Sequence, residues 1–179
     1  MPEIGIRPTI STDLSELTSL EHSYQSTYVW QMERNVEDGQ ILVSFREVRL
    51  PRKVRVEYPR SPELIQLEWS QRLEMLTATL QEIPVGYIRL EDHFSPNTAW
   101  VTDLVVRENM RRQGIATALL LAAQQWSVQR NLRRMVISMQ SKNYPAIRLA
   151  LKLGYEFCGY NDHFYANRDI ALFFARFLR

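Results

Sequence analysis

The residues best suited to binding chemistry lie at positions 103–121, in the segment DLVVRENMRRQGIATALLL. The segment begins as a short apolar strand and ends as an amphipathic helix rich in Ala and Leu. The turn between them carries Arg111, Arg112 and Gly114. The first amide groups of a helix have no acceptor within the helix and lie at the positive end of its dipole, so they favour anions. The small residues and the arginines therefore predict a phosphate-binding loop, best suited to a pyrophosphate.

Two common nucleotide-binding motifs do not fit this loop. The Walker A motif needs Lys and then Ser or Thr after its last glycine, whereas Ile115 and Ala116 follow Gly114. The dinucleotide fingerprint needs three spaced glycines, and the loop has one. The alternative to a phosphate-binding loop is an arginine-rich surface turn without a binding function.

Strands and helices on both sides must position the loop. Hydrophobic periodicity and turn residues predict strands at 4–8, 27–33, 41–50, 75–80, 85–90, 100–106, 135–139, 155–160 and 171–178, with a short extended piece at 54–58. Caps and helical spacing predict helices at 14–22, 61–71, 115–130 and 145–153, the third facing the sheet through Ile115, Ala118, Leu119, Ala122 and Trp126. This order predicts a mixed α/β domain with a mostly antiparallel sheet and one parallel crossover around the helix that follows the loop.

Composition narrows the class of protein. The 179 residues favour one domain, and the net charge of +2 without blocks of like charge argues against nucleic acid or an anionic membrane as a partner. The single cysteine excludes an internal disulfide, and the three histidines show no metal-ligand spacing. We see neither a signal peptide nor an apolar run long enough to cross a bilayer, so we expect a cytoplasmic protein without a metal.

The loop resembles the acetyl-CoA loop of the GNAT superfamily of N-acetyltransferases. The family pattern Arg/Gln-x-x-Gly-x-Gly/Ala falls on Arg111, Gly114 and Ala116. A second family signature, Asn-x-x-Ala-Ile-x-x-Tyr-x-x-x-Gly-Phe, resembles residues 143–155, which begin with Asn143 and end with Gly154-Tyr155. Further segments at 28–59, 101–106 and 158–178 are most similar to streptothricin acetyltransferases. The resemblance implies a GNAT-like α/β fold of about seven strands, with a splayed parallel pair at the cofactor site.

The resemblance also implies how acetyl-CoA binds. Residues 99–179 would form mainly the acetyl-CoA half and residues 1–98 mainly the acceptor half of a single domain. The main chain of the strand before the loop would bind the pantetheine arm through Leu104, Val105 and Val106. Asn143 and Ala146 would lie near the end of that arm, although Asn143 also reads as a helix cap ahead of Pro145. The loop itself would hold the pyrophosphate through Arg111, Arg112, Gln113, Gly114, Ile115, Ala116 and Thr117.

Family chemistry implies direct attack of an amine on the thioester. A nearby group must then bind the amine or accept the proton that it loses. Asp103 is the first candidate and Glu91, on the neighbouring strand, the second; each also reads as a solvated acid at a strand end. Glu47 and Glu57 are weaker candidates. The tyrosine that protonates the leaving thiolate in the family corresponds to Ala150 here, which has no proton to donate. Another hydroxyl or a water must replace it, with Tyr165 as one candidate and Tyr144 and Tyr155 as the others.

Three functions stay open at this point. The leading one is transfer of the acetyl group to a primary amine of a small cationic molecule, for which streptothricin is a model. A second is acetylation of protein N-termini or lysines, and a third is an acetyl-CoA-binding module with weakened catalysis, suggested by Ala150. A groove for an extended peptide would favour the second, and a closed acidic pocket the first. The apolar strand at 171–178 could join a second copy in a homodimer or could lie inside one sheet.

Overall fold

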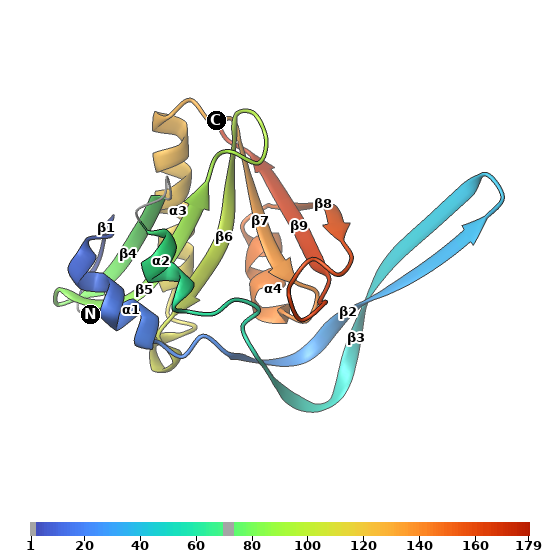
Figure 1. Cartoon of the computed structure of the whole chain (residues 1–179), viewed down its shortest axis with the longest axis horizontal. Coiled ribbons are helices and arrows are strands. Elements are labelled where there is room, and N and C mark those ends of the chain that lie inside the picture. The colour runs from blue at the N-terminus through green and yellow to red at the C-terminus, as the bar shows by residue number, and fades with distance from the viewer. Residues whose placement is uncertain (1–2, 70–73) are drawn as a thin grey trace.

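The computed structural model describes residues 3–69 and 74–179, and a seven-stranded sheet forms its body (Figure 1). The strand order is β1-β4-β5-β6-β7-β9-β8, and every neighbouring pair is antiparallel except β6 and β7. This confirms the predicted mostly antiparallel sheet with one parallel pair. The strands are β1 (Ile4–Pro8), β4 (Glu74–Leu80), β5 (Ile83–Glu91), β6 (Thr98–Val106), β7 (Arg134–Gln140), β8 (Glu156–Asn161) and β9 (Ala171–Phe177).

Helices cover both faces of the sheet because successive strand residues point to opposite sides. Tyr87 and Val105 pack in the smaller core with helices α1 and α2, whereas Ile88 and Val106 pack in the larger core with α3 and α4. Two short 3₁₀ turns, η1 and η2, precede α1 and α3. The bounds are η1 (Ser11–Asp13), α1 (Leu14–Ser19), α2 (Leu64–Glu68), η2 (Glu108–Met110), α3 (Ile115–Gln129) and α4 (Tyr144–Lys152).

Helix α3 buries a face that differs in part from the predicted one. Ile115 and Leu119 are buried as expected, at 3% and 0% exposure. The predicted Ala118, Ala122 and Trp126 are only half-buried. Ala122 and Trp126 nevertheless pack against the larger core. The further buried residues of the helix are Leu120, Ala123 and Ser127.

A long hairpin, which we call the arm, projects away from the body (Figure 1). It consists of β2 (Tyr24–Glu37) and β3 (Gln40–Val56), which pair only with each other. The predicted turn at Asp38 and Gly39 is confirmed, with Gly39 at φ 75°. Both strands are longer than predicted, and the piece expected at 54–58 is continuous with β3 up to Val56.

The base of the arm is fastened to the body by aromatic rings and one main-chain bond. The Trp30 ring meets Phe174 edge to face, with centroids 6.4 Å apart, and the Phe45 ring lies 5.1 Å from that of Tyr160. The Trp30 amide donates to the Ser141 carbonyl over 3.0 Å. The arm therefore starts over the carboxyl end of β7.

Two predicted boundaries are wrong, and a third lies outside the described residues. Helix α1 ends at Ser19 rather than near His22, because Leu20 is extended with φ −61° and ψ 148°. The turn between β4 and β5 lies at Gln81 and Glu82, both with positive φ, rather than at 82–84. Helix α2 ends at Glu68, and the predicted end at position 71 lies outside the described residues.

The apolar last strand lies inside the sheet. β9 pairs with β7 on one side and with β8 on the other, so its main chain offers no edge to a second copy. Of the two interpretations of residues 171–178, an interface with a second copy or a strand inside one sheet, the structure confirms the strand inside the sheet. In the part of the chain that the structure describes, no helix is long and apolar enough to span a membrane.

Replacing a fully buried leucine of α3 should destabilise the fold. Leu119 is 0% exposed, so we expect Leu119→Ala to lower the free energy of unfolding by about 2–5 kcal/mol through lost burial and the cavity that remains. Leu121 on the same helix is 46% exposed, and Leu121→Ala is the matched control, with an expected change of about 0.5 kcal/mol or less. Urea unfolding followed by circular dichroism measures both, and equal losses would contradict the packing described for α3.

His22 should make stability depend on pH. Its Nδ1–H donates to the Leu20 carbonyl over 2.6 Å, and its Nε2 lies 3.0 Å from the Tyr87 hydroxyl, which can donate only to an unprotonated nitrogen. Burial lowers the pKa of His22 below its ordinary 6.5, so the unfolded chain binds the proton more readily. This stabilisation is present above pH 6.5 and is lost as the pH falls through the folded pKa.

We therefore expect the His22 ring resonances to titrate below pH 6.5 in two-dimensional NMR. Unfolding experiments between pH 7 and pH 5 should show a loss of stability that is smaller in His22→Gln. A His22 titration midpoint at or above 6.5 would contradict the assignment.

Candidate active site

The predicted phosphate loop (residues 111–117) has the backbone of an anion-binding turn. Arg112 and Gly114 both adopt positive φ, at 66° and 87°. The first helical bond of α3 runs from the Ala118 amide to the Gly114 carbonyl, so the amides of Ile115, Ala116 and Thr117 precede it. A Cβ atom built on Gly114 would meet no heavy atom within 4 Å, which shows open space in front of the helix. The turn can therefore admit a ligand to unpaired amides at the positive end of a helix dipole.

The side chain of Arg111 is turned away from this space. Its Nε donates to the Val106 carbonyl over 2.9 Å and its Nη1 to the Ser23 carbonyl over 2.8 Å, while Nη2 donates to the Glu21 carbonyl. The expectation that both arginines of the turn offer their charge to a phosphate is thus wrong for the Arg111 side chain. That guanidinium instead ties the loop to the chain that leads into the arm. Arg112, in contrast, is exposed.

A cavity opens where β6 and β7 separate. The parallel pairing runs from Thr98 with Arg134 to Val101 with Ile137, and it stops there. Thr102 is an extra residue relative to β5, since Arg89 faces Asp103 and Leu90 faces Val101. Such a bulge bends the strand and redirects its side chains. The side chains that line the cavity include Tyr58, Asp103, Leu104, Ser138, Asn143 and Tyr165.

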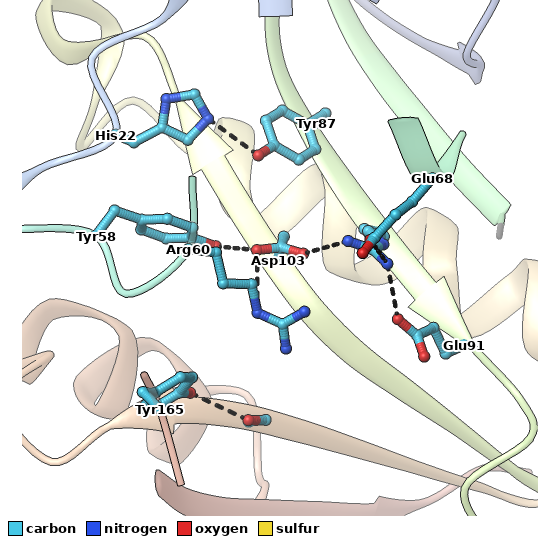
Figure 2. Close-up of polar contacts among 10 residues, drawn as sticks. His22, Tyr58, Arg60, Glu68, Tyr87, Glu91, Asp103 and Tyr165 are labelled. Atoms are coloured by element: carbon cyan, nitrogen blue, oxygen red, sulfur yellow. Dashed lines mark hydrogen bonds and ion pairs between the residues drawn. The ribbon is translucent and has the colours of Figure 1, made fainter. Parts of the chain in front are cut away.

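Asp103 is the carboxylate of the cavity wall. It is 4% exposed, and the Tyr58 hydroxyl donates to its Oδ1 over 2.5 Å (Figure 2). Arg89 Nη1 lies 3.5 Å from Oδ2, and Arg60 Nε lies 4.0 Å from Oδ1. Apart from its ion pair with Arg89, Oδ2 accepts no hydrogen bond from the described residues. The buried Thr102 hydroxyl also has no hydrogen-bond partner among them. The cavity therefore contains buried polar atoms that a ligand could satisfy.

Glu91 lies on the other side of Arg89. Its Oε1 is 3.0 Å from Arg89 Nη2, and its Oε2 is 3.3 Å from His93 Nε2. Glu68 also contacts Arg89, at 2.5 Å. Figure 2 shows Glu91 directed away from Asp103. The sequence predicted that both Asp103 and Glu91 lie near the reacting groups. The structure brings only Asp103 to the cavity, because Arg89 lies between the two carboxylates.

Tyr165 is the predicted hydroxyl that reaches the cavity. Its oxygen lies 3.2 Å from Ser138 Oγ on β7, opposite Asp103 on β6 (Figure 2). Burial raises its pKa to about 12, so the phenol keeps its proton at neutral pH. The Tyr144 ring packs on Tyr28, with centroids 4.7 Å apart. Tyr155 is buried in the larger core, where its hydroxyl donates to Met135 Sδ, so neither of these two belongs to the cavity wall.

Sequence reasoning missed Tyr58. It follows β3 at the base of the arm, and burial and the neighbouring Asp103 raise its pKa well above the ordinary value. Its ring lies edge to face against His22, with centroids 5.4 Å apart. No local pattern marks this tyrosine, because its partner Asp103 lies far along the chain.

Asn143 and Ala146 lie at the start of α4, beside the cavity. Asn143 Oδ1 accepts a hydrogen bond from the Ala146 amide over 3.2 Å, so the helix-cap reading of Asn143 holds. Both residues also line the cavity. The main chain on the β7 side of Leu104 and its neighbours is left without a strand partner. In the described ranges, no three His, Cys, Asp or Glu side chains converge in a way that could hold a metal.

Solved structures share this fold over nearly the whole chain. A nourseothricin acetyltransferase has a TM-score of 0.81 at 16% identity, covering 98% of this chain and 99% of that one. A protein of Bacillus anthracis str. Ames described as a streptothricin acetyltransferase, solved with acetyl coenzyme A, has 0.79 at 19%, covering 99% of both. NAA60 of Arabidopsis thaliana, bound to a bisubstrate analogue, has 0.68 at 16%, also covering 99% of both. At these identities the likeness shows the fold alone.

Sequence comparison supplies the family. A search of curated proteins finds no significant match. The model of the Acetyltransferase (GNAT) family matches residues 41–155, which include the phosphate loop, Asp103 and Asn143. Because this match spans more than half of the 179 residues, the chain belongs to the GNAT family of acetyl-CoA-dependent acetyltransferases.

Proposed function

We propose that this enzyme acetylates a primary amine of a small molecule, which binds as an ammonium ion against Asp103. The observation that carries the proposal is the Asp103 carboxylate, 4% exposed, in the wall of the cavity between β6 and β7. A cation that binds beside this carboxylate would form a charge-assisted hydrogen bond at a site largely removed from water. An alkyl ammonium has a pKa of about 10, so it arrives charged at neutral pH.

The residues present fit acetyl-CoA at this site. The amides of Ile115, Ala116 and Thr117 would hold the pyrophosphate, with Gly114 leaving room for it. The open side of β6, from Leu104 to Val106, would bind the pantetheine arm through main-chain groups, as an added strand does. When bound, the thioester supplies an activated acetyl group. In this assignment residues 99–179 form the cofactor half, and the arm base with Tyr58 contributes the acceptor half.

The side chains of the cavity have separate roles in the proposed reaction. Asp103 orients the acceptor ammonium and accepts, directly or through a water, the proton that the nitrogen loses before it attacks, and its own position is held by Tyr58 and Arg89. Tyr165 keeps its phenolic proton at neutral pH and faces the same cavity, so it is the candidate hydroxyl for the leaving sulfur. Ala150 is 1% exposed and carries no polar group, which is why the hydroxyl has to come from another element.

A small acceptor fits the surroundings better than an extended peptide. The arm base crosses the carboxyl end of β7, where the Trp30 amide bonds to the Ser141 carbonyl and the Tyr24 hydroxyl donates to Gln140 Oε1 over 2.6 Å. These contacts occupy main chain and side chains that a peptide would need. The two structures of highest TM-score described above are named for nourseothricin and streptothricin, and this supports a small cationic acceptor. The similarity to a ribosomal-protein-S18-alanine N-acetyltransferase of Escherichia coli, with a TM-score of 0.69 at 16% identity, supports the alternative of a protein acceptor.

A panel assay tests the proposed function. Coenzyme A release should be measured by thiol detection with small amines, streptothricin, peptides with free N-termini and lysine-containing peptides. We expect turnover with small amines and not with peptides. Preference for peptides would support the protein acetyltransferase, and tight acetyl-CoA binding without turnover would support the weakened module.

Substitution of Gly114 should abolish cofactor binding. In Gly114→Glu, a side chain fills the space in front of α3 and adds a negative charge where a diphosphate would bind. Gly39→Glu is the matched control, because Gly39 has a similar φ of 75° and equally open surroundings at the tip of the arm. Both variants bear the strain of a side chain at positive φ, but only Gly114→Glu should lose coenzyme A binding in calorimetry. Unchanged affinity would refute the assignment of the loop.

Removal of the Asp103 charge should impair acetylation without affecting coenzyme A affinity. We expect Asp103→Asn to lower kcat/KM for the acceptor by about 100-fold or more, and a rise in KM would identify the acceptor-binding role. Glu37→Gln, at an exposed site on the arm, is the control and should keep wild-type kinetics. Because Arg89 loses a buried partner, the thermal unfolding of Asp103→Asn must be checked alongside. Unaltered kcat/KM would contradict the proposal.

A further inference from the structure

Arg60 is an arginine with an open hydrogen-bonding face at the active site. It lies in the chain between the arm and α2, and its side chain is 26% exposed. Among the described residues, the Arg60 side chain forms an ion pair from its Nε to Asp103 Oδ1. The distance of 4.0 Å is too long for a hydrogen bond. Arg89 and Arg111, in contrast, donate to carboxylate or carbonyl oxygens at close range. The terminal nitrogens of Arg60 are therefore available to a ligand.

The guanidinium of Arg60 lies next to the proposed acceptor site. Figure 2 shows it between Asp103 and Tyr165, which both line the cavity, and its Nε lies 4.0 Å from Asp103 Oδ1. Burial opposes its charge while Asp103 and the tyrosines favour it, and the pKa of Arg60 is raised overall. A half-buried guanidinium that keeps its charge and has few hydrogen bonds gains from an oxyanion ligand.

We infer that the acceptor carries a carboxylate close to its amine, with the ammonium bound by Asp103 and the carboxylate by Arg60. This inference rests on the proposed function and narrows its acceptor to an amino-acid-like zwitterion. The 4.0 Å between Arg60 Nε and Asp103 Oδ1 means that the two charges of the acceptor are separated by a short carbon skeleton. The start of α3 already provides for the diphosphate of the cofactor, so Arg60 is not needed there.

Charge balance favours a carboxylate over other groups. Asp103 has Arg89 as a second cationic neighbour, and Arg89 in turn contacts Glu68 and Glu91. Both oxygens of Asp103 already have a cationic neighbour, Arg89 at 3.5 Å from Oδ2 and Arg60 at 4.0 Å from Oδ1, so an ammonium alone would add a third cation beside this carboxylate, whereas an acceptor that also carries a carboxylate restores the balance. A phosphate would leave a second negative charge uncompensated. A second ammonium would lie near Arg60 and be repelled, which makes a polyamine a poorer acceptor than an amino acid.

Matched acceptors test the inference in the wild-type enzyme. One series is β-alanine, β-alaninamide and ethylamine, and the other is lysine, lysinamide and cadaverine. We expect kcat/KM to be about 10- to 100-fold higher for the carboxylates than for the amides, the range of a charge-assisted hydrogen bond. Equal kcat/KM for acids and amides would overturn the inference while leaving the acetyltransferase itself in place. Coenzyme A release with none of the amines would overturn the proposed function as well.

Variants assign the preference to Arg60. In Arg60→Gln the advantage of β-alanine over its amide should disappear, and kcat/KM for cadaverine should rise because a repulsive charge is gone. A gain on cadaverine cannot come from misfolding. Arg60→Lys keeps the charge but loses the planar fork, and should retain part of the preference. Arg46→Gln is the control, since Arg46 lies on the arm with 70% of its side chain exposed. A preference for β-alanine that survives in Arg60→Gln would overturn the inference.

Binding gives a readout that does not depend on turnover. Calorimetric titration of β-alanine into the protein with coenzyme A bound should show affinity about 10- to 100-fold weaker in Arg60→Gln than in the wild type. Binding of β-alaninamide should be the same in both. Equal losses for the two ligands would mean that Arg60 only supports the fold of the site, and would overturn its role in acceptor recognition.

Discussion

The separation of β6 from β7 is the constraint on which the rest of the site depends. The two strands pair from Thr98 to Val101 and then part, so their main chains need other partners beyond that point. Helices α3 and α4 begin at the carboxyl ends of these same strands, which brings two helix starts to one opening. Ligands bind at such positions in α/β sheets, where neighbouring strands diverge and loops leave in different directions. The phosphate loop, Asp103 and Asn143 are all consequences of this one break in the sheet.

A second property of the site is its buried charge. Arg89 is 4% exposed, and it is held by Asp103, Glu91 and Glu68. Apolar residues of the same size would often give equal or greater stability, because taking ions out of water is costly. The charges are thus poorly explained by stability alone. They set the position of Asp103 and leave Arg60 as the charge that is open to solvent and ligand.

The sequence predicted those parts of the structure that depend on local rules. The phosphate loop and the start of α4 were predictable because positive φ, small residues and helix caps have local signatures at Gly114 and Asn143. The direction of the Arg111 side chain was not, since its acceptors at Glu21 and Ser23 are far away in the chain. Tyr58 and Arg60 reach Asp103 only because the arm returns to β6, and no periodicity encodes that return. Glu91 was misplaced because the bulge at Thr102 and the intervening Arg89 are invisible in a strand pattern.

The contacts of Arg111 have a consequence for how the two substrates influence each other. Its guanidinium joins the phosphate loop to the residues just ahead of β2, while Tyr58 joins the residues just after β3 to Asp103. Both ends of the arm are thereby attached to the two halves of the catalytic centre. Thermodynamic coupling between sites is reciprocal, so in the proposed binding mode any effect of a bound nucleotide on the affinity for the amine has an equal counterpart in the other direction. In that binding mode, the arm is the segment that connects the phosphate loop with Asp103.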